Sequence, residues 1–300
     1  MSFDEAFKSV LIGSNVKLSL KLNHLVIKKD ESETKLFLKD INLIILETHQ
    51  INLNSALLNA LVKHKIILLT CDESHQINGI FTPFLGHFLS AKIAKEQMAV
   101  SVQRKAILWQ KIIKNKIKNQ AYVLKFSKHQ KQSEELLEFS KRVLLGDSKN
   151  VEANAAALYF KTLFGKNFYR EELCFVNSAL NYGYAVIRAC IIRSVCISGL
   201  LTWQGIKHDN IYNNFNLCDD LIEVFRPWVD LCVLALLKNK QNDNEFITKE
   251  NKRMLIENLQ SKVKIDGKIY PLNRAINHYT QNFKNALLDN QELMLVEFDD

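Results

Sequence analysis

Glu152, His208 and the acidic cluster of Asp219, Asp220 and Glu223 are candidate ligands for a divalent cation. Two carboxylates and one imidazole from this set would make a site with mixed oxygen and nitrogen ligands. Such a site suits Mn²⁺ or Mg²⁺ better than zinc with thiolates. Glu152, His208 and Glu223 lie 56 and 15 positions apart along the chain, so only the tertiary fold can bring them together.

The acidic residues around Glu223 allow two interpretations. On a helix, Asp219 and Asp220 lie four and three residues before Glu223, so the carboxylates are neighbours. Like charges repel there unless a cation lies between them. Carboxylates in a first helical turn also favour the helix dipole, which is a purely structural role open to Asp219, Asp220 and Glu152. His208 lies in a polar segment, where a histidine is commonly just exposed.

Several other kinds of chemistry lack their motifs in this sequence. There is no G-x-x-x-x-G-K-[ST], G-x-G-x-x-G, G-x-S-x-G or H-E-x-x-H. None of the six cysteines forms a C-x-x-C pair, so we expect free thiols in a reducing compartment. The N-terminus has no basic region followed by an apolar one, and no stretch of 18 uncharged apolar residues occurs. We therefore expect a cytoplasmic protein without a membrane span.

Positive charge is concentrated in one segment. Residues 92–131 contain eleven Lys or Arg and one acidic residue, Glu96, which leaves the rest of this +8 chain at −2. Solvated helix faces usually mix both signs, because pairs of opposite charge stabilise them. Binding to a DNA or RNA backbone is the functional interpretation, and a solvated basic face that touches nothing is the alternative. A membrane surface fits less well, since the segment lacks a clean apolar face.

The chain changes character near residue 88. Alternating apolar and polar residues before that point predict strands, including a hairpin formed by 24–28 and 35–39. Apolar residues at helical spacing dominate afterwards, and only nine Gly and three Pro occur in 300 residues. We predict an α+β fold with a small β-rich domain (1–88) and a larger all-α domain (89–300). One helix is expected over 91–127, and the acidic tail 293–300 is expected to be loose.

Three further patterns surround the candidate ligands: an Ala-rich helix with Glu152, G-x-x-H with His208, and N-L-C-D-D-L-I-E-V-F-R-P-W-V-D at 216–230. Together they resemble the CRISPR-associated spacer-acquisition integrases, the universal adaptation enzymes of CRISPR systems. The block at 108–121, L-N-Y-G-Y-A at 180–185 and I-I-L-L-T-C-D at 66–72 agree as well. The resemblance spans nearly the whole chain and is greatest to the type II versions. Cys218 departs from the family, where an alanine is common.

The resemblance implies a site and a set of partners. Glu152, His208 and Glu223 match the family's ligands for Mg²⁺ or Mn²⁺, with Asp219 and Asp220 as possible assistants. The family dimerises mainly through its β-rich domain and forms a heterohexamer with a small ferredoxin-like adaptation partner. The family binds double-stranded DNA, namely the protospacer and the CRISPR repeat. The basic segment is expected to bind the DNA backbone through Lys92, Arg104, Lys105, Lys111, Lys114 and Lys118.

The implied reaction is transesterification. A 3′-hydroxyl of the protospacer attacks a phosphodiester of the repeat, while the metal polarises phosphoryl oxygens and lowers the pKa of the hydroxyl. No covalent enzyme intermediate is needed, which agrees with the absence of a nucleophile motif. Two alternatives are a metal-dependent nuclease that hydrolyses DNA and a non-catalytic nucleic-acid scaffold.

Overall fold

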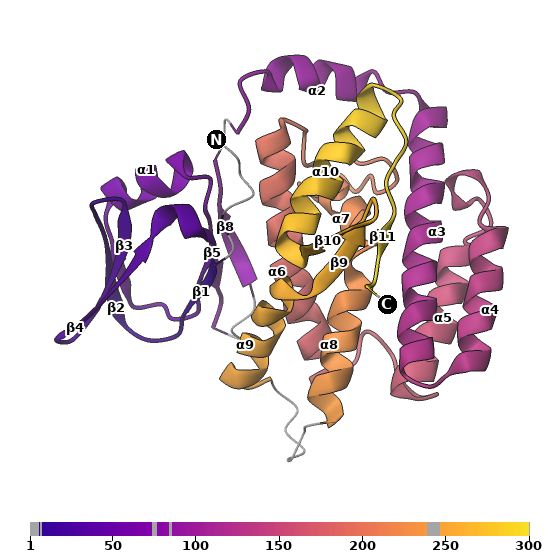
Figure 1. Ribbon diagram of the computed structural model, residues 1–300, viewed down its shortest axis with the longest axis horizontal. Coiled ribbons are helices and arrows are strands. Elements are labelled where there is room, and N and C mark those ends of the chain that lie inside the picture. The colour runs from indigo at the N-terminus through magenta and orange to yellow at the C-terminus, as the bar shows by residue number, and fades with distance from the viewer. Residues whose placement is uncertain (1–5, 7, 74–76, 84–85, 239–246, 300) are drawn as a thin grey trace.

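The computed structural model describes residues 6, 8–73, 77–83, 86–238 and 247–299, and it shows a mixed α and β protein (Figure 1). The N-terminal part is rich in strands and the remainder is largely helical, as the sequence predicts. The last strand of the first part ends at Phe81 and the next helix begins at Ser90. The division into two domains at residue 88 stays a prediction.

Two four-stranded sheets form the N-terminal part, with strand orders β1-β5-β7-β8 and β4-β3-β2-β6. The predicted hairpin is confirmed as β3 and β4, which pair antiparallel. The elements are β1 (Lys8–Ile12), β2 (Val16–Lys21), β3 (His24–Lys29), β4 (Ser32–Phe37), β5 (Ile41–Leu46), β6 (Ile51–Leu53), α1 (Ser55–Lys63), β7 (Ile67–Cys71) and β8 (Ile77–Phe81).

Strand β5 joins two hydrophobic cores. Its side chains alternate between the two faces of the sheet, as in any strand. Leu43 and Ile45 belong to the core shared with the helices, whereas Ile44 and Leu46 belong to the core inside the N-terminal part. Both faces are covered, which explains why this strand is apolar at nearly every position.

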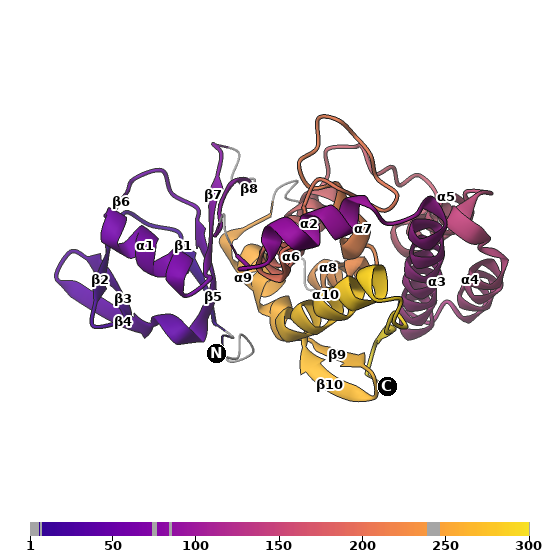
Figure 2. The ribbon, with the colours of Figure 1, turned by 90° about the horizontal axis from the view of Figure 1, so that it is seen from above.

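The helical part contains α2 (Ser90–Met98), α3 (Val102–Phe126), α4 (Gln130–Arg142), α5 (Val151–Phe164), α6 (Phe175–Ser198), α7 (Asn216–Ile222), α8 (Arg226–Lys238), α9 (Lys249–Glu257) and α10 (Leu272–Leu288). Figure 2 shows α3, α4 and α5 packed side by side, with α6 nearer the centre of the molecule. Helix α6 is long and apolar enough to cross a membrane by composition, but 72% of its most apolar window is buried inside the protein. Its hydrophobicity is therefore used in the core.

The prediction of an all-α second part is wrong. Strands β9 (Lys262–Ile265), β10 (Lys268–Pro271) and β11 (Val296–Glu297) form a three-stranded sheet. The hairpin of β9 and β10 turns at Asp266 and Gly267, whose φ values are +51° and +72°. Asp-Gly favours this turn because it tolerates positive φ at both positions, and that local signal was overlooked.

The predicted helix over 91–127 is two helices. Helix α2 ends at Met98 and α3 begins at Val102. The side chain of Ser101 accepts a hydrogen bond of 3.2 Å from the backbone N–H of Arg104, so Ser101 caps the second helix. Serine is favoured at this position because it satisfies an otherwise unpaired N–H group.

The prediction of a loose tail is also wrong. Val296 exchanges two hydrogen bonds of 2.8 Å with the side chain of Asn115 in α3, and its carbonyl oxygen also accepts from Asn119. Phe298 stacks between Trp228 and Tyr122, with ring centroids 3.9 and 4.5 Å apart. The tail is held by main-chain pairing and by aromatic contacts; Asp300 lies outside the described residues.

Candidate metal and DNA site

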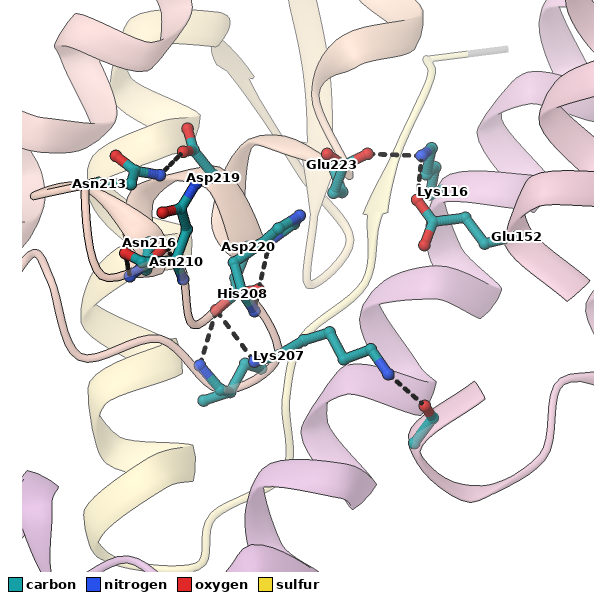
Figure 3. Close-up of polar contacts among 12 residues, drawn as sticks. Lys116, Glu152, Lys207, His208, Asn210, Asn213, Asn216, Asp219, Asp220 and Glu223 are labelled. Carbon is teal, nitrogen blue, oxygen red and sulfur yellow. Dashed lines mark hydrogen bonds and ion pairs between the residues drawn. The ribbon is translucent and has the colours of Figure 1, made fainter. Parts of the chain in front are cut away.

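Side chains from α3, from α5 and from the residue after α7 meet in one largely buried cluster (Figure 3). The ammonium of Lys116, in the middle of α3, lies 2.5 Å from Oε1 of Glu152 and 2.5 Å from Oε2 of Glu223. Glu152 belongs to the first turn of α5, and Glu223 directly follows α7. The fold therefore brings two of the three predicted ligands to a single cation.

A second cation holds the other oxygen of Glu223. Arg226, three residues later, places its Nε 2.8 Å from Oε1 of that carboxylate. Burial raises the pKa of Glu223, but the charges of Arg226 and Lys116 outweigh it and bring the pKa to about 2. Burial lowers the pKa of Lys116, while Glu223 and Glu152 more than compensate and raise it. Both Glu223 and Lys116 therefore stay charged near neutral pH.

Glu152 is positioned by the start of its helix. Buried Asp147 accepts hydrogen bonds of 2.9 and 3.0 Å from the backbone N–H groups of Val151 and Glu152. It satisfies two N–H groups that a helix leaves unpaired at its beginning. Capping at this helix start is done by Asp147, and the carboxylate of Glu152 points to Lys116 instead.

The third predicted ligand, His208, is held by Asp220. Nδ1 of His208 lies 2.8 Å from Oδ1 of Asp220, which is completely buried. The hydrogen bond to Asp220 raises the pKa of His208, burial opposes it, and the charges of Asp220 and Glu223 add to the increase. Because Nδ1 is engaged, Nε2 is the ring nitrogen left for a ligand. Metal-binding histidines usually have this arrangement, with the other nitrogen tied to a carboxylate.

Asp220 also organises the backbone before His208. Its carboxylate accepts hydrogen bonds from the backbone N–H groups of Ile206, Lys207 and His208, at 2.6, 3.3 and 3.1 Å. Gly205 allows this close approach, since a Cβ there would lie 2.3 Å from the carbonyl oxygen of His208 and 2.8 Å from Oδ2 of Asp220. A glycine is therefore required at the first position of G-x-x-H.

Asp219 faces away from the cluster around Lys116. Its two oxygens lie 2.5 and 2.9 Å from the guanidinium of Arg188, and Asn213 donates a further bond of 2.6 Å. Figure 3 shows Asp219 and Asn213 on the side of His208 opposite Glu223. Of the acidic residues predicted in this block, only Glu223 contacts Lys116.

The donor set has the chemistry of a site for a hard divalent cation. Two carboxylates already share one cation, the ammonium of Lys116, and His208 has one nitrogen available. Within the part of the chain that the structure describes, no three His, Cys, Asp or Glu side chains are grouped closely enough to hold a metal. In this structure, therefore, Lys116 neutralises the carboxylates of Glu152 and Glu223.

The predicted DNA-binding cations have different surroundings. Lys118 is exposed, and Lys105 and Lys114 are half-buried. Lys92 lies 3.7 Å from Glu96, and Lys111 pairs with Glu292 of the tail. The guanidinium of Arg104 donates to the carbonyl oxygens of Ala286 and Gln291. A groove of about 670 Å³ lies beside the tail, and the lysines among its lining residues are Lys111, Lys114 and Lys118.

Two residues of this cluster, Lys116 and Arg226, were not singled out from the sequence. Lys116 was counted only as part of the basic segment, and Arg226 only as part of a motif. The signal for Lys116 is its place on the apolar stripe of α3, three and four residues after the buried Ile113 and Ile112. A lysine on a core-facing stripe requires a buried partner.

Comparisons with known proteins match nearly the whole chain. The family model "CRISPR associated protein Cas1" matches residues 10–265. A CRISPR-associated endonuclease Cas1 of Neisseria meningitidis serogroup C (strain 8013) is 36% identical over 283 residues, 94% of this chain and 93% of that protein. These matches confirm the resemblance that the sequence blocks predict.

Solved structures share the fold at low sequence identity. A casposase bound to integration product has a TM-score of 0.77 at 21% identity, over 95% of this chain and 92% of that one. A CAS1 protein from Thermotoga maritima has a TM-score of 0.75 at 18% identity, over 98% and 99% of the two chains. A Cas6-RT-Cas1–Cas2 complex has a TM-score of 0.72 at 20% identity, over 96% of this chain and 35% of that one. The family model and the Neisseria relative show that this chain, which has the same fold as these structures, belongs to the Cas1 family of CRISPR-associated proteins.

Proposed function

We propose that the protein is the metal-dependent integrase and endonuclease of CRISPR adaptation, which joins protospacer DNA to the CRISPR repeat. The observation that carries this proposal is the convergence of Glu152 and Glu223 on one buried cation, beside a histidine whose Nδ1 is tied to Asp220. The Neisseria relative is named an endonuclease, and the casposase structure holds an integration product.

The proposed ligands of Mg²⁺ or Mn²⁺ are Glu152, Glu223 and Nε2 of His208. When bound, the metal polarises phosphoryl oxygens and lowers the pKa of the attacking 3′-hydroxyl. Asp220 fixes the orientation of the His208 ring, and Arg226 fixes Glu223. No side chain acts as a nucleophile, because the DNA hydroxyl forms the new phosphodiester bond and the displaced strand leaves with its own 3′-hydroxyl.

DNA binding is proposed for the basic face of α3. Phosphate contacts give affinity without sequence preference. Replacing Lys114 and Lys118 by Ala should weaken binding to unrelated duplexes equally and flatten the log–log salt dependence by roughly 0.9 for each lost phosphate contact. An unchanged slope would show that these lysines are merely solvated.

The proposed partners follow the family. We propose a homodimer formed through the β-rich N-terminal part and a heterohexamer with a small ferredoxin-like Cas2 protein, located in the cytoplasm. The name of the Cas6-RT-Cas1–Cas2 complex supports a Cas2 partner. Sedimentation of the purified protein with and without that partner tests both assemblies.

The decisive experiment is an integration assay with the purified protein, its Cas2 partner, labelled protospacer DNA and a plasmid that carries the array. Label joined to the plasmid in Mg²⁺ or Mn²⁺, and absent in EDTA, supports integration. Cleavage without joining indicates a hydrolytic nuclease instead. Binding without any metal-dependent product indicates a scaffold.

A further inference from the structure

A buried asparagine of α3 links the C-terminal tail to the proposed metal site. Asn119 belongs to the sequence block at 108–121 and is 4% exposed. Its side-chain amide donates two hydrogen bonds, one of 3.2 Å to the backbone carbonyl oxygen of Val224 and one of 2.9 Å to that of Val296. Val224 directly follows Glu223, and Val296 begins strand β11 of the tail. One amide therefore joins the tail to the neighbour of a proposed metal ligand.

The two acceptors determine which way the amide of Asn119 points. An asparagine side chain has one NH₂ group, which can donate twice, and one oxygen, which can only accept. Two carbonyl oxygens can be satisfied together only by the NH₂ group. Val224 and Val296 are completely buried, so an unpaired carbonyl oxygen at either residue would be costly. The contact with Val296 therefore holds the amide in the orientation that also serves Val224.

The carbonyl group of Val224 lies in the segment that carries Glu223. Residues 223–225 form the turn between α7 and α8. Lys116 holds the carboxylate of Glu223, and Asn119, one turn further along α3, holds the residue that follows it. Neighbouring Cα atoms are about 3.8 Å apart across a rigid peptide plane, so fixing Val224 restricts the position of Glu223.

The tail is anchored on both sides of Asn119. Asn115, one helical turn earlier, exchanges two hydrogen bonds of 2.8 Å with the tail backbone. Phe298 stacks on Tyr122 of α3, at 4.5 Å between ring centroids, and on Trp228 of α8, at 3.9 Å. Figure 1 shows the tail running alongside α3. Residues 293–299, here called the strap, therefore tie α3 to the helix that follows the turn.

We propose that Asn119 is a positioning residue for Glu223 and that the strap holds Asn119 in place. This inference rests on the proposed function, which assigns Glu223 as a metal ligand. A misplaced Glu223 would bind Mn²⁺ more weakly, because hard cations gain affinity from the charge and the geometry of their oxygen ligands. Saturating Mn²⁺ would draw the carboxylate back into place, so the rate of strand transfer would then recover.

The test is the dissociation constant for Mn²⁺, measured from the electron paramagnetic resonance signal of the free ion with the full chain and no DNA. Asn119→Ala removes both donors without adding a charge. We expect it to weaken Mn²⁺ binding roughly 10-fold, the lower end of the range for loss of an outer-shell partner. Phe298→Ala, which loosens the strap from the tail side, should weaken binding as well. In strand-transfer assays, Asn119→Ala should raise the half-saturating Mn²⁺ concentration and leave the rate at saturation near that of the wild type.

Asn282→Ala is the matched control. Asn282 of α10 is also buried and also holds the strap, since it donates 3.0 Å to the carbonyl oxygen of Glu292 and accepts 2.8 Å from the N–H of Met294. These contacts lie before β11, away from the turn at residues 223–225. The control should lower the melting temperature, as Asn119→Ala does, and leave Mn²⁺ binding unchanged.

Equal weakening of Mn²⁺ binding by Asn119→Ala and Asn282→Ala would overturn the proposal, and so would wild-type binding by Asn119→Ala. Should Asn119→Ala not fold, Phe298→Ala decides, and unchanged Mn²⁺ binding in that variant would count against the strap. The wild type and Glu223→Gln provide a separate check. If the two bound Mn²⁺ equally, the ligand assignment in the proposed function would be refuted, and with it the reason for positioning Glu223.

Discussion

Lys116 and Glu223 form an ion pair of 2.5 Å in which both side chains are buried. The lysine comes from the middle of α3 and the glutamate from the residue after α7. Together with Glu152, they place one positive charge between two negative ones in a site that we propose for a divalent cation. A metal held by the same two carboxylates has to take over the neutralising role of Lys116.

Replacing Lys116 by Met tests that competition. Without metal, we expect the free energy of unfolding to fall by about 3–5 kcal/mol, the usual cost of removing one partner of a buried ion pair. Mn²⁺ should then raise the melting temperature more in the variant than in the wild type, because no ammonium has to be displaced. Thermal unfolding in EDTA and across a Mn²⁺ titration measures both effects. Lys118→Met, at an exposed position, is the control, and equal Mn²⁺ shifts in variant and wild type would refute the competition.

Glu152→Gln should separate chemistry from folding. The substitution keeps the shape of a side chain that is 25% exposed and removes its charge. Lys116 retains Glu223, so we expect a loss in stability of no more than about 1–2 kcal/mol. Strand transfer should fall by more than the roughly 10- to 100-fold that the loss of an outer-shell partner costs a metal site. Asp219→Asn, which alters the contacts with Arg188 and Asn213 but none in the cluster around Lys116, should cost less. The reverse order of effects would contradict our ligand assignment.

Gly205→Ala should disorganise the segment that carries His208. A Cβ at this position approaches the backbone oxygen of His208 to 2.3 Å, which forces the chain to move. We expect the variant to lose strand transfer. In an NMR spectrum of the protein with labelled histidines, the resonances of His208 should also no longer match those of the wild type. Gly13→Ala is the matched control, because its Cβ would meet only an ordinary contact of 3.5 Å to Glu47. Normal activity in Gly205→Ala would show that the loop adapts.

Asp230 gives the stability of the protein a distinct pH dependence. Burial raises the pKa of this carboxyl to about 6, although the hydrogen bonds that it accepts from Tyr184 and Tyr159 lower the pKa. The folded state therefore holds the proton more tightly than the unfolded state, so the contribution of Asp230 to stability is lost as the pH rises from about 4 to about 6. The two-unit shift corresponds to about 3 kcal/mol. Urea unfolding should show this decrease in the wild type and not in Asp230→Asn; parallel pH profiles would refute it.

Local sequence patterns were sufficient for much of the secondary structure. Helix α6 ends where Gly199 adopts φ +83° at the cap, a position at which glycine is favoured and which is readable from the sequence. The hairpin of β3 and β4 follows from alternation around a polar turn. The Asp266-Gly267 hairpin was equally readable from its turn residues, and the error was to assign the whole of residues 89–300 to an all-α domain.

Only the tertiary structure decided how the candidate site is assembled. Lys116 lies 36 residues from Glu152 and 107 from Glu223, and no local periodicity encodes a contact across such separations. Tertiary contacts also decide the different roles of Asp219, Asp220 and Glu223. One turn of helix directs Asp219 to Arg188, Asp220 to the backbone around His208, and Glu223 to Lys116. Residue types reveal which groups can bind a cation, but the packing of α3, α5 and α7 determines which of them face one.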